Sequence, residues 1–332
     1  MVHADLLADK VFLTWNASCT RTSTLANHFG AQPIRISYLQ GKKFLPLLLL
    51  RYLISFTKTF LVLAKRRPKV VFMENQPPFL IMACYLYTRL FGGAYVIDSH
   101  SGAFNNKKWA WAMPMYRFLA KNAYMNINTN EHHKSLVEGW GGRSIVISDI
   151  PVEHSTSYER IDVDTLSVAV VCSFSFDEPV EEIWEAARQC PGVTFYLTGN
   201  DSKLSSGLKS SQPENIKTVG FVPIQQYFGL LSSAKAVMVL TTRDHTMQRG
   251  AYEALSLDQP IITTDWPVLR KSFGGAAVYV RNDPDSIAEG VRELLSQHED
   301  YKSAARRQRV VRRKNFEATR RKLMEEYIER LS

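Results

Sequence analysis

A short polar segment between two apolar runs gathers side chains that bind anions and hydroxyl groups. Arg243 and Arg249 carry fixed positive charge, while Gln248 and Gly250 lie at the start of an expected helix. Arginines and the N–H groups of a helix N-terminus together suit a diphosphate. Glu253, one turn further on, can accept hydrogen bonds from the two neighbouring hydroxyls of a ribose. An ordinary solvated helix with surface arginines explains the same residues equally well.

A second polar segment follows an apolar run in the first half of the chain and contains Asp98 and His100. A sugar hydroxyl that acts as a nucleophile must lose its proton, and an aspartate or histidine at the end of a strand can take it. The alternative is that Asp98 only caps the following segment and His100 only bonds a neighbour.

Several residues of the first half are expected to meet a substrate beside this pair. Arg21 and Ser23 follow the first expected strand, although a simple helix cap explains Ser23 too. Glu74 and Asn75 end the third strand, and Trp109 lies in an aromatic and basic segment after His100. We assign these residues to an acceptor site: Arg21, Ser23, Glu74, Asn75 and Trp109.

The sequence predicts that alternating strands and helices position these groups. Residues 236–242 and 260–264 are apolar runs of strand length, and residues 247–257 between them are rich in helix formers. This pattern predicts a βαβ unit with a parallel, doubly covered sheet. Ligands of such sheets bind beyond the carboxyl ends of the strands, which is where both polar segments lie.

The same alternation extends over the whole chain and predicts two doubly wound α/β domains facing a central cleft. We expect the first at residues 1–152 and the second at 165–312, with a linker rich in Pro, Ser and Asp between them. In the second domain, the loop after the strand at 166–172 is expected to face donor phosphates, with Ser175 and Asp177 capping the next helix. Its donor-binding candidates are Ser173 and Phe174, with Gly199 at the tip of the following strand.

The segment MQRGAYEALSLDQPIITTDWPVLR resembles the donor-binding segment of GT-B glycosyltransferases, especially family 4. The resemblance implies a GT-B fold, a ribose-binding role for Glu253 and nucleobase contacts from Phe221 and Val222. It also implies that a C-terminal helix, residues 313–332, crosses back onto the first domain. The family has a second glutamate, near the transferred sugar, where this chain has His245. We therefore count His245 among the catalytic candidates and favour inversion over retention.

The segments ENQPPF and VIDSHSGAF resemble the first domain of the mannosyltransferases that extend dolichol-diphosphate chitobiose. That resemblance implies a lipid-linked, polyprenyl-diphosphate acceptor and inversion, with Asp98 or His100 as the base. Arginines and helix amides can hold the leaving diphosphate, so we expect a hexosyltransferase without metal or other cofactor.

Charge is distributed unevenly. Residues 1–150 contain 18 Lys and Arg against 7 Asp and Glu, whereas the remainder contains 23 against 25. The basic half should meet an anionic partner, and the chain shows no nucleic-acid-binding motif. Residues 45–64 are leucine-rich but contain Arg51 and Lys58, which are costly inside a bilayer. We expect this helix to lie in the interface of an anionic membrane, to pack on the sheet, or both.

The cysteines and histidines show no metal-ligand spacing. We expect the four cysteines to be reduced and mostly buried. We expect His132 and His133 to be surface residues. With no recognisable signal peptide, we expect a cytoplasmic enzyme bound peripherally to the inner face of the cell membrane.

The predicted activity is transfer of a sugar from a UDP- or GDP-sugar to a lipid-linked saccharide in polysaccharide, including exopolysaccharide, or glycolipid biosynthesis. Two alternatives stay open. One is a nucleotide-sugar epimerase on the same fold, and the other is a non-catalytic membrane-binding subunit of a glycosyltransferase complex.

Overall fold

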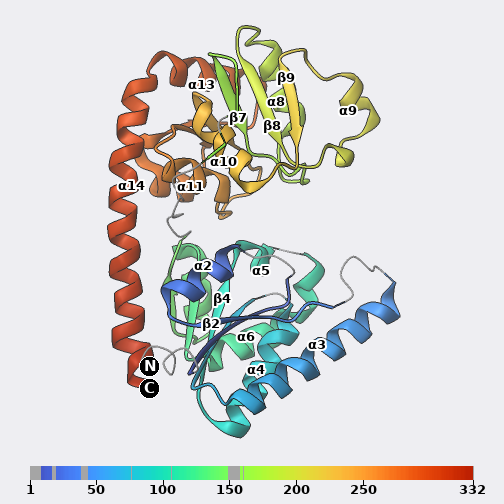
Figure 1. The fold of residues 1–332 in the computed structure, drawn as a ribbon, viewed down its shortest axis with the longest axis vertical. Coiled ribbons are helices and arrows are strands. Elements are labelled where there is room, and N and C mark those ends of the chain that lie inside the picture. Colours follow the sequence, from blue (N-terminus) through green and yellow to red (C-terminus); the bar gives the residue numbers. More distant parts are fainter. Residues whose placement is uncertain are drawn as a thin grey trace. The chain divides into compact units, whose positions relative to one another are not determined.

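The computed structural model describes residues 9–16, 20–38, 44–75, 77–105, 107–148, 158–159 and 161–331. The chain divides into two compact units (Figure 1), the first formed by Met1–Ile150 with Asn315–Ser332 and the second by Pro151–Lys314. Cys19 and most of the expected linker lie outside the described residues.

The first unit is built on a six-stranded parallel sheet with the order β2-β1-β3-β4-β5-β6. Its strands are β1 (Lys10–Thr14), β2 (Gln32–Arg35), β3 (Val70–Glu74), β4 (Ala94–Ser99), β5 (Met125–Asn128) and β6 (Ser144–Val146). Its helices are α2 (Thr20–His28), α3 (Leu45–Arg66), α4 (Pro78–Phe91), α5 (Ser101–Asn105), the 3₁₀-helix η1 (Lys107–Ala112), α6 (Met113–Asn122) and α7 (Glu131–Gly139).

Alternate residues of each strand bury opposite faces of this sheet, as the period of a strand requires. Val11 and Leu13 pack under α3, α4 and α6 in one cluster. Phe12 points the other way, toward α2 and the C-terminal segment, where Phe316 and Leu323 complete a second cluster. The C-terminal residues are therefore part of the hydrophobic core of the first unit.

The second unit repeats this plan with the strand order β12-β11-β10-β7-β8-β9, again parallel. Its strands are β7 (Ser167–Val170), β8 (Thr194–Thr198), β9 (Ile216–Gly220), β10 (Ala236–Val239), β11 (Ile261–Thr264) and β12 (Ala277–Val280). Its helices are α8 (Val180–Arg188), η2 (Asp201–Lys203), α9 (Ser206–Ser210), α10 (Ile224–Ser233), α11 (Arg249–Ser256), α12 (Pro267–Phe273), η3 (Gly274–Ala276) and α13 (Pro284–Ser296).

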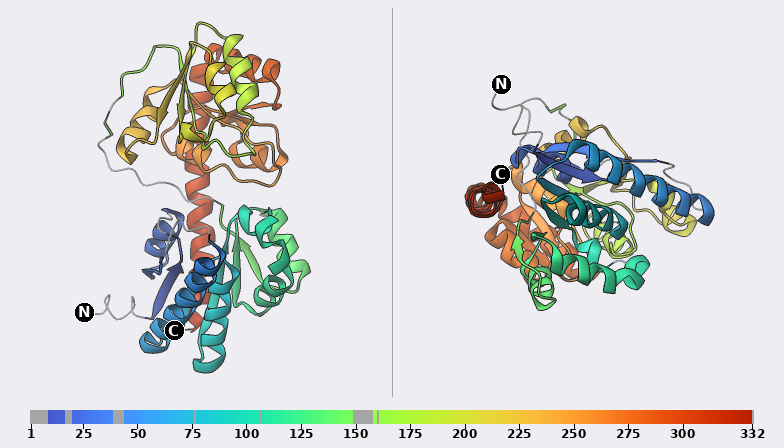
Figure 2. Two further views of the ribbon diagram at one scale, coloured as in Figure 1. Left: turned by 90° about the vertical axis from the view of Figure 1, so that its right-hand side faces the viewer. Right: turned by 90° about the horizontal axis from the view of Figure 1, so that it is seen from below.

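One long helix, α14 (His298–Arg321), contains the residue at which the second unit ends, Lys314. Figure 1 draws it as one continuous helix, and the right-hand view of Figure 2 shows it end-on. It continues into the π-helical turn η4 (Lys322–Ile328) and η5 (Glu329–Leu331).

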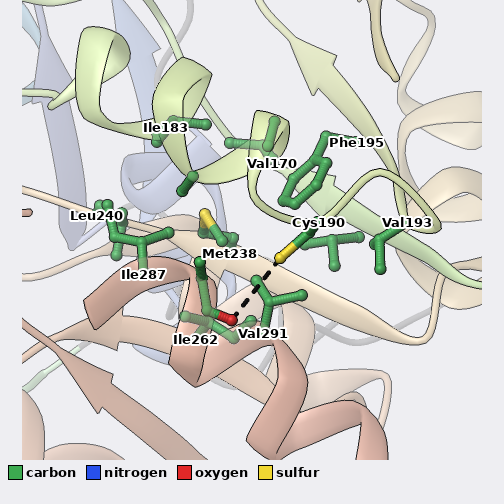
Figure 3. Packing of buried hydrophobic residues seen from close by; sticks show 14 of the residues in the cluster. Val170, Ile183, Cys190, Val193, Phe195, Met238, Leu240, Ile262, Ile287 and Val291 are labelled. Carbon is green, nitrogen blue, oxygen red and sulfur yellow. Dashed lines mark hydrogen bonds between the residues drawn. The ribbon is translucent and has the colours of Figure 1, made fainter. Parts of the chain in front are cut away.

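The core of the second unit is also divided by its sheet. On one face α8 and α13 cover Val168 and Val170, and on the other α10, α11 and α12 cover Ala169. Figure 3 shows the first of these clusters, in which the thiol of Cys190 donates to the carbonyl oxygen of Ala288 at 3.8 Å. Cys84, Cys172 and Cys190 are free and buried, as expected for these three thiols.

Helix α3 has both a core face and an exposed apolar face. Thr59 and Leu63 are fully buried. Leu49, Leu53 and Leu61 repeat at helical spacing on another face and are each about 60% exposed. By length and composition Pro46–Arg66 could cross a membrane, but a core helix of a soluble protein can pass the same test.

The predicted fold class, two doubly wound α/β units, is confirmed. Three local expectations are wrong. His133 is 1% exposed and stacks on the ring of Phe104 at 4.2 Å, because α7 turns it into the core. Strand β10 ends at Val239, shorter than predicted. Helix α8 has no side-chain cap from Ser175 or Asp177.

Candidate functional site

The polar groups of the first unit lie at the carboxyl edge of its sheet. The chain moves from β1 to β2 in one direction and to β3 in the other, so the order reverses between β1 and β3. Ligands of open α/β sheets bind at such a reversal. Glu74 ends β3 there and is 6% exposed; its carboxylate accepts from the Thr14 hydroxyl at 2.5 Å and from Asn16 Nδ2 at 2.9 Å.

Asp98, on the next strand, is held in a buried ion pair. Arg21 Nη2 donates to Oδ1 at 2.9 Å and Arg21 Nε to Oδ2 at 3.0 Å, with both side chains at most 2% exposed. Arg21 Nη2 also donates to the carbonyl oxygen of Ile147 at 2.9 Å. Burial alone would raise the pKa of Asp98, but the guanidinium of Arg21 and the ring of His100 hold it well below its usual range. Asp98 is therefore a permanent carboxylate with its oxygens occupied.

His100 lies beside this pair with its side chain about one-third exposed. Its Nε2 faces Asp98 Oδ2 at 3.4 Å. Burial acts to lower the pKa of His100, yet the carboxylate of Asp98 outweighs it and the pKa is raised from 6.5. An imidazole oriented by a carboxylate can accept a proton at the other ring nitrogen, Nδ1.

A chain of hydrogen bonds connects Asn75 to an aromatic region. Asn75 Nδ2 donates to Ser99 Oγ at 3.1 Å, and Ser99 Oγ lies 2.7 Å from the hydroxyl of Tyr116. Asn75, Tyr116 and Trp109 line one small hollow. The Trp109 ring in turn lies 6.0 Å from that of Tyr52 on α3. The structure thus brings four of the five acceptor candidates into one region, while Ser23 lies half-buried on α2 two residues after Arg21.

The second unit also reverses its strand order, between β7 and β10. The loops after these two strands contact each other. Thr242 N donates to the carbonyl oxygen of Asp177 at 2.8 Å, and the guanidinium of Arg243 stacks 4.1 Å from the centre of the Phe176 ring. A Cβ on Gly250 would lie 2.7 Å from Val171 Cγ1, so only glycine lets α11 begin this close to β7.

Glu253 is the buried carboxylate of this site, with a side chain 10% exposed. The hydroxyl of Tyr227 donates to Oε2 at 2.7 Å, and Arg249 Nε donates to Oε1 at 2.8 Å. Arg249 itself is about one-third exposed, and its Nη groups have no hydrogen-bond partner among the described residues. Its guanidinium therefore still has donors for an anion at the first turn of α11.

In the loop after β7, backbone amides and a hydroxyl donate to a carboxylate close by in the chain, that of Glu178. Ser173 N and Ser175 N donate to Glu178, the latter at 2.7 Å, and the Ser173 hydroxyl donates to Glu178 Oε1 at 3.1 Å. Phe174 has a left-handed φ of 54°, which brings these amides together. Gly199, with a φ of 96°, could not hold a Cβ, which would lie 2.2 Å from the Cys172 carbonyl oxygen.

The remaining donor candidates lie around these two loops. Gln248 precedes α11, and His245 has a left-handed φ of 56° with its Nε2 3.5 Å from Asp244 Oδ2. Phe221 is 91% exposed and, with Val222, precedes α10, the helix that supplies Tyr227. The described residues contain no group of three or more His, Cys, Asp or Glu side chains able to hold a metal.

Two contacting residues were missed by the sequence interpretation. Tyr227 lies within an ordinary apolar helix, and only its contact with Glu253 distinguishes it. Glu178 follows the polar loop directly. An acidic residue five positions after Ser173 could have predicted that the loop amides donate to a carboxylate of the chain itself.

Residues 178–327 match the glycosyl transferase-like protein family. No curated protein matches the chain. The matched segment contains the βαβ unit with Arg243, Arg249 and Glu253, as well as α10 with Tyr227.

Solved structures extend the likeness to nearly the whole chain. Sucrose-phosphate synthase from Thermosynechococcus elongatus superposes with a TM-score of 0.71 at 15% identity, covering 98% of this chain and 96% of that one. HepE of Anabaena, in complex with UDP and glucose, gives 0.68 at 13% identity, covering 99% and 93%. The chain carries a glycosyltransferase domain on a GT-B fold. The predictions of this fold and of a glycosyltransferase are confirmed.

The GT-B fold is shared with another enzyme class. A putative UDP-N-acetylglucosamine 2-epimerase from Listeria monocytogenes superposes with a TM-score of 0.60 at 13% identity, covering 92% of this chain and 87% of that one. The reaction of this glycosyltransferase must therefore be argued from its own residues.

Replacing Arg21 by Ala should destabilise the protein by about 3–5 kcal/mol, because it leaves the Asp98 carboxylate buried and unpaired. Urea unfolding of the wild type and the variant measures this difference. The matched control is Lys69→Ala, which breaks the exposed pair of Lys69 with Asp9 and should cost less than about 1 kcal/mol. Equal effects of the two substitutions would contradict the structural role of the Arg21–Asp98 pair.

Proposed function

We propose that this glycosyltransferase moves a sugar from a UDP- or GDP-sugar to a lipid-linked, polyprenyl-diphosphate saccharide at an anionic membrane surface. The observation that carries the proposal is the buried carboxylate of Glu253, one turn after the α11 N-terminus and bonded to Arg249. In this arrangement a carboxylate that can accept hydrogen bonds from hydroxyl groups lies one helical turn from N–H groups that can donate to an anion.

The donor side follows from the order of groups along α11. The diphosphate binds at the first turn, where helix N–H groups have no acceptor within the helix and Arg249 has Nη donors to offer. Arg243 on the preceding loop adds a second guanidinium. The ribose then meets Glu253, a carboxylate that accepts hydrogen bonds from hydroxyl groups. HepE, whose structure contains UDP, supports a nucleotide donor for this fold.

We assign the loop after β7 a smaller role in binding the donor phosphates than its sequence suggested. Its amides already donate to Glu178, and a second anion there would meet a like charge. The leaving diphosphate is therefore stabilised chiefly from the β10–α11 side. Two guanidiniums and helix amides supply this stabilisation without a metal.

His100 is the proposed base on the acceptor. The carboxylate of Asp98 is fully engaged by Arg21, so it orients His100 and stabilises the imidazolium rather than taking the proton itself. The acceptor hydroxyl gives its proton to His100 as its oxygen attacks the anomeric carbon, and the nucleoside diphosphate leaves. Attack opposite the leaving group inverts the configuration. We assign His245, on the loop between β10 and α11, to contact with the transferred sugar.

Helix α3 supports the membrane part of the proposal. Its exposed leucines, Leu49, Leu53 and Leu61, form an apolar stripe beside the exposed cations Lys58 and Lys65. A helix of this kind lies in a membrane interface with its cations at the head groups. Arg51 and Lys58 within the helix disfavour a span. Tyr52 of the same helix contacts Trp109, so the acceptor region continues from this surface. A cytoplasmic location at the inner face of the cell membrane fits this surface.

The two alternatives make different demands on these residues. An epimerase needs no acceptor and no base at His100, whereas a non-catalytic subunit needs no donor site. The arrangement of Arg243, Arg249 and Glu253 favours a donor-binding enzyme over the subunit.

Nucleotide binding tests the donor site. UDP or GDP should raise the melting temperature of the wild type, because a ligand that binds only the folded state stabilises it. Glu253→Ala should abolish most of this shift. Glu289→Ala, on α13 and away from the site, is the control and should leave the shift unchanged. Absence of a shift with either nucleotide would contradict the proposed donor.

The role of His100 predicts a particular pH dependence. The carboxylate of Asp98 raises the pKa of His100 above its ordinary value, so His100 is protonated and inactive as a base at lower pH, and kcat/KM should rise as the pH increases through the raised pKa. His100→Ala should lower kcat by about 10²–10⁴-fold and remove this rise. His132→Ala, an exposed histidine, is the control. An unchanged profile in His100→Ala would exclude His100 as the base.

Vesicle binding tests the surface of α3. The wild type should sediment with vesicles of anionic phospholipid, more weakly at high salt. Serine at Leu49, Leu53 and Leu61 together should weaken binding at least tenfold, since each buried leucine contributes about 1.5–3 kcal/mol. Serine at the exposed Val310 and Val311 of α14 is the control. Equal sedimentation of both variants would contradict this membrane surface.

A further inference from the structure

An exposed aromatic ring on the loop after β7 lies against an arginine of the candidate donor site. Phe176 is 82% exposed, and the guanidinium of Arg243 lies 4.1 Å from the centre of its ring. A ring so exposed adds little to the hydrophobic core, and the contact that it makes is with a cation. We propose that Phe176 is a positioning residue that orients the Arg243 guanidinium toward the diphosphate of the nucleotide donor. This inference rests on the proposed donor function.

A backbone hydrogen bond brings the two side chains together. Asp177, which follows Phe176, accepts from Thr242 N at 2.8 Å. Thr242 in turn directly precedes Arg243. The ring and the guanidinium therefore project from neighbouring positions of two bonded loops, and their contact follows from this pairing of the backbone.

The loop that carries Phe176 is also fixed by hydrogen bonds of its own. Ser173 N and Ser175 N donate to the Glu178 carboxylate at 3.0 Å and 2.7 Å. These amides are therefore already engaged, and a second anion beside Glu178 would be repelled. The loop contributes to donor binding through the Phe176 ring instead, which acts on Arg243.

Stacking holds a guanidinium without using its hydrogen-bond donors. The five N–H groups of arginine lie in the guanidinium plane, so a ring against its flat face leaves them able to reach an anion. Among the residues that the structure describes, the Arg243 guanidinium takes part in no hydrogen bond or ion pair. Arg21, by contrast, is neutralised by Asp98. The ring thus restrains Arg243 and leaves its charge available for a diphosphate.

Restraint before binding raises affinity because a free arginine side chain has many rotamers. A flexible side chain loses this freedom when it binds a phosphate, and the loss weakens binding. The Phe176 ring restrains Arg243 before the ligand arrives, so less freedom is lost on binding. A contact of this kind at a partly exposed site should raise affinity by about 3- to 10-fold.

Calorimetric titration with UDP, and in parallel with GDP, tests this inference. Phe176→Leu keeps an apolar side chain but removes the ring, and it should weaken binding by about 3- to 10-fold. Phe176→Tyr keeps the ring and should bind within about twofold of the wild type. Arg243→Gln should weaken binding by about 10-fold or more, because it removes a charged donor to the diphosphate. In the Arg243→Gln background, Phe176→Leu should have no further effect, since the ring acts through the guanidinium.

The matched control is Phe91→Leu. In the first unit the guanidinium of Arg67 lies 3.9 Å from the centre of the Phe91 ring, so this substitution removes a pair of the same kind. It should leave the affinity for both nucleotides unchanged. The melting temperature of Phe176→Leu without ligand should equal that of the wild type, because an exposed ring contributes little to folding.

Three results would overturn the inference while the donor site stands. The first is unchanged affinity in Phe176→Leu or in Arg243→Gln. The second is an equal loss from Phe176→Leu with and without Arg243, which would mean that the ring does not act through the guanidinium. The third is a lowered melting temperature of unliganded Phe176→Leu, which would assign the ring to folding. If the wild type binds neither nucleotide, the proposed function fails and this inference fails with it.

Discussion

A parallel sheet covered by helices on both faces leaves its polar side chains one place to lie, beyond the carboxyl ends of the strands. Both units of this chain obey that constraint, and the candidate residues follow from it. In the first unit Glu74 and Asp98 are neighbours because their strands pair in register. In the second, the loops after β7 and β10 contact each other because these strands are adjacent where the order reverses. Side chains at these edges are buried without becoming part of the apolar core, so each carboxylate needs a partner.

The two edges satisfy their carboxylates in different ways. Asp98 is neutralised by one buried guanidinium and lies beside His100. Glu253 shares its oxygens between a phenol and a guanidinium that is about one-third exposed. Glu178 accepts hydrogen bonds from the loop amides that the sequence assigned to a phosphate. In the proposed function, the first arrangement orients a base, the second receives hydroxyls, and the third limits where an anion binds.

The sequence revealed the fold and the edges of the sheets but not the pairings between distant residues. Apolar runs of strand length predicted strands at residues 236–242 and 260–264, where the structure has β10 and β11, because burial on both faces requires such runs. The pairing of Arg21 with Asp98 joins residues 77 positions apart, and no local pattern encodes it. His133 was expected on the surface, yet the phase of α7 turns it against Phe104. Tyr227 had no signal of its own, since its role depends on how α10 packs against α11.

Release of nucleoside diphosphate in the presence and absence of acceptor tests the central claim most directly. The wild-type protein would be incubated with UDP- and GDP-sugars, with and without a polyprenyl-diphosphate saccharide in anionic vesicles. We predict that nucleotide release requires the lipid-linked saccharide and that the saccharide is extended by one sugar of inverted configuration. Epimerisation of the donor without acceptor, or turnover of none of these donors in the presence of acceptor, would contradict it.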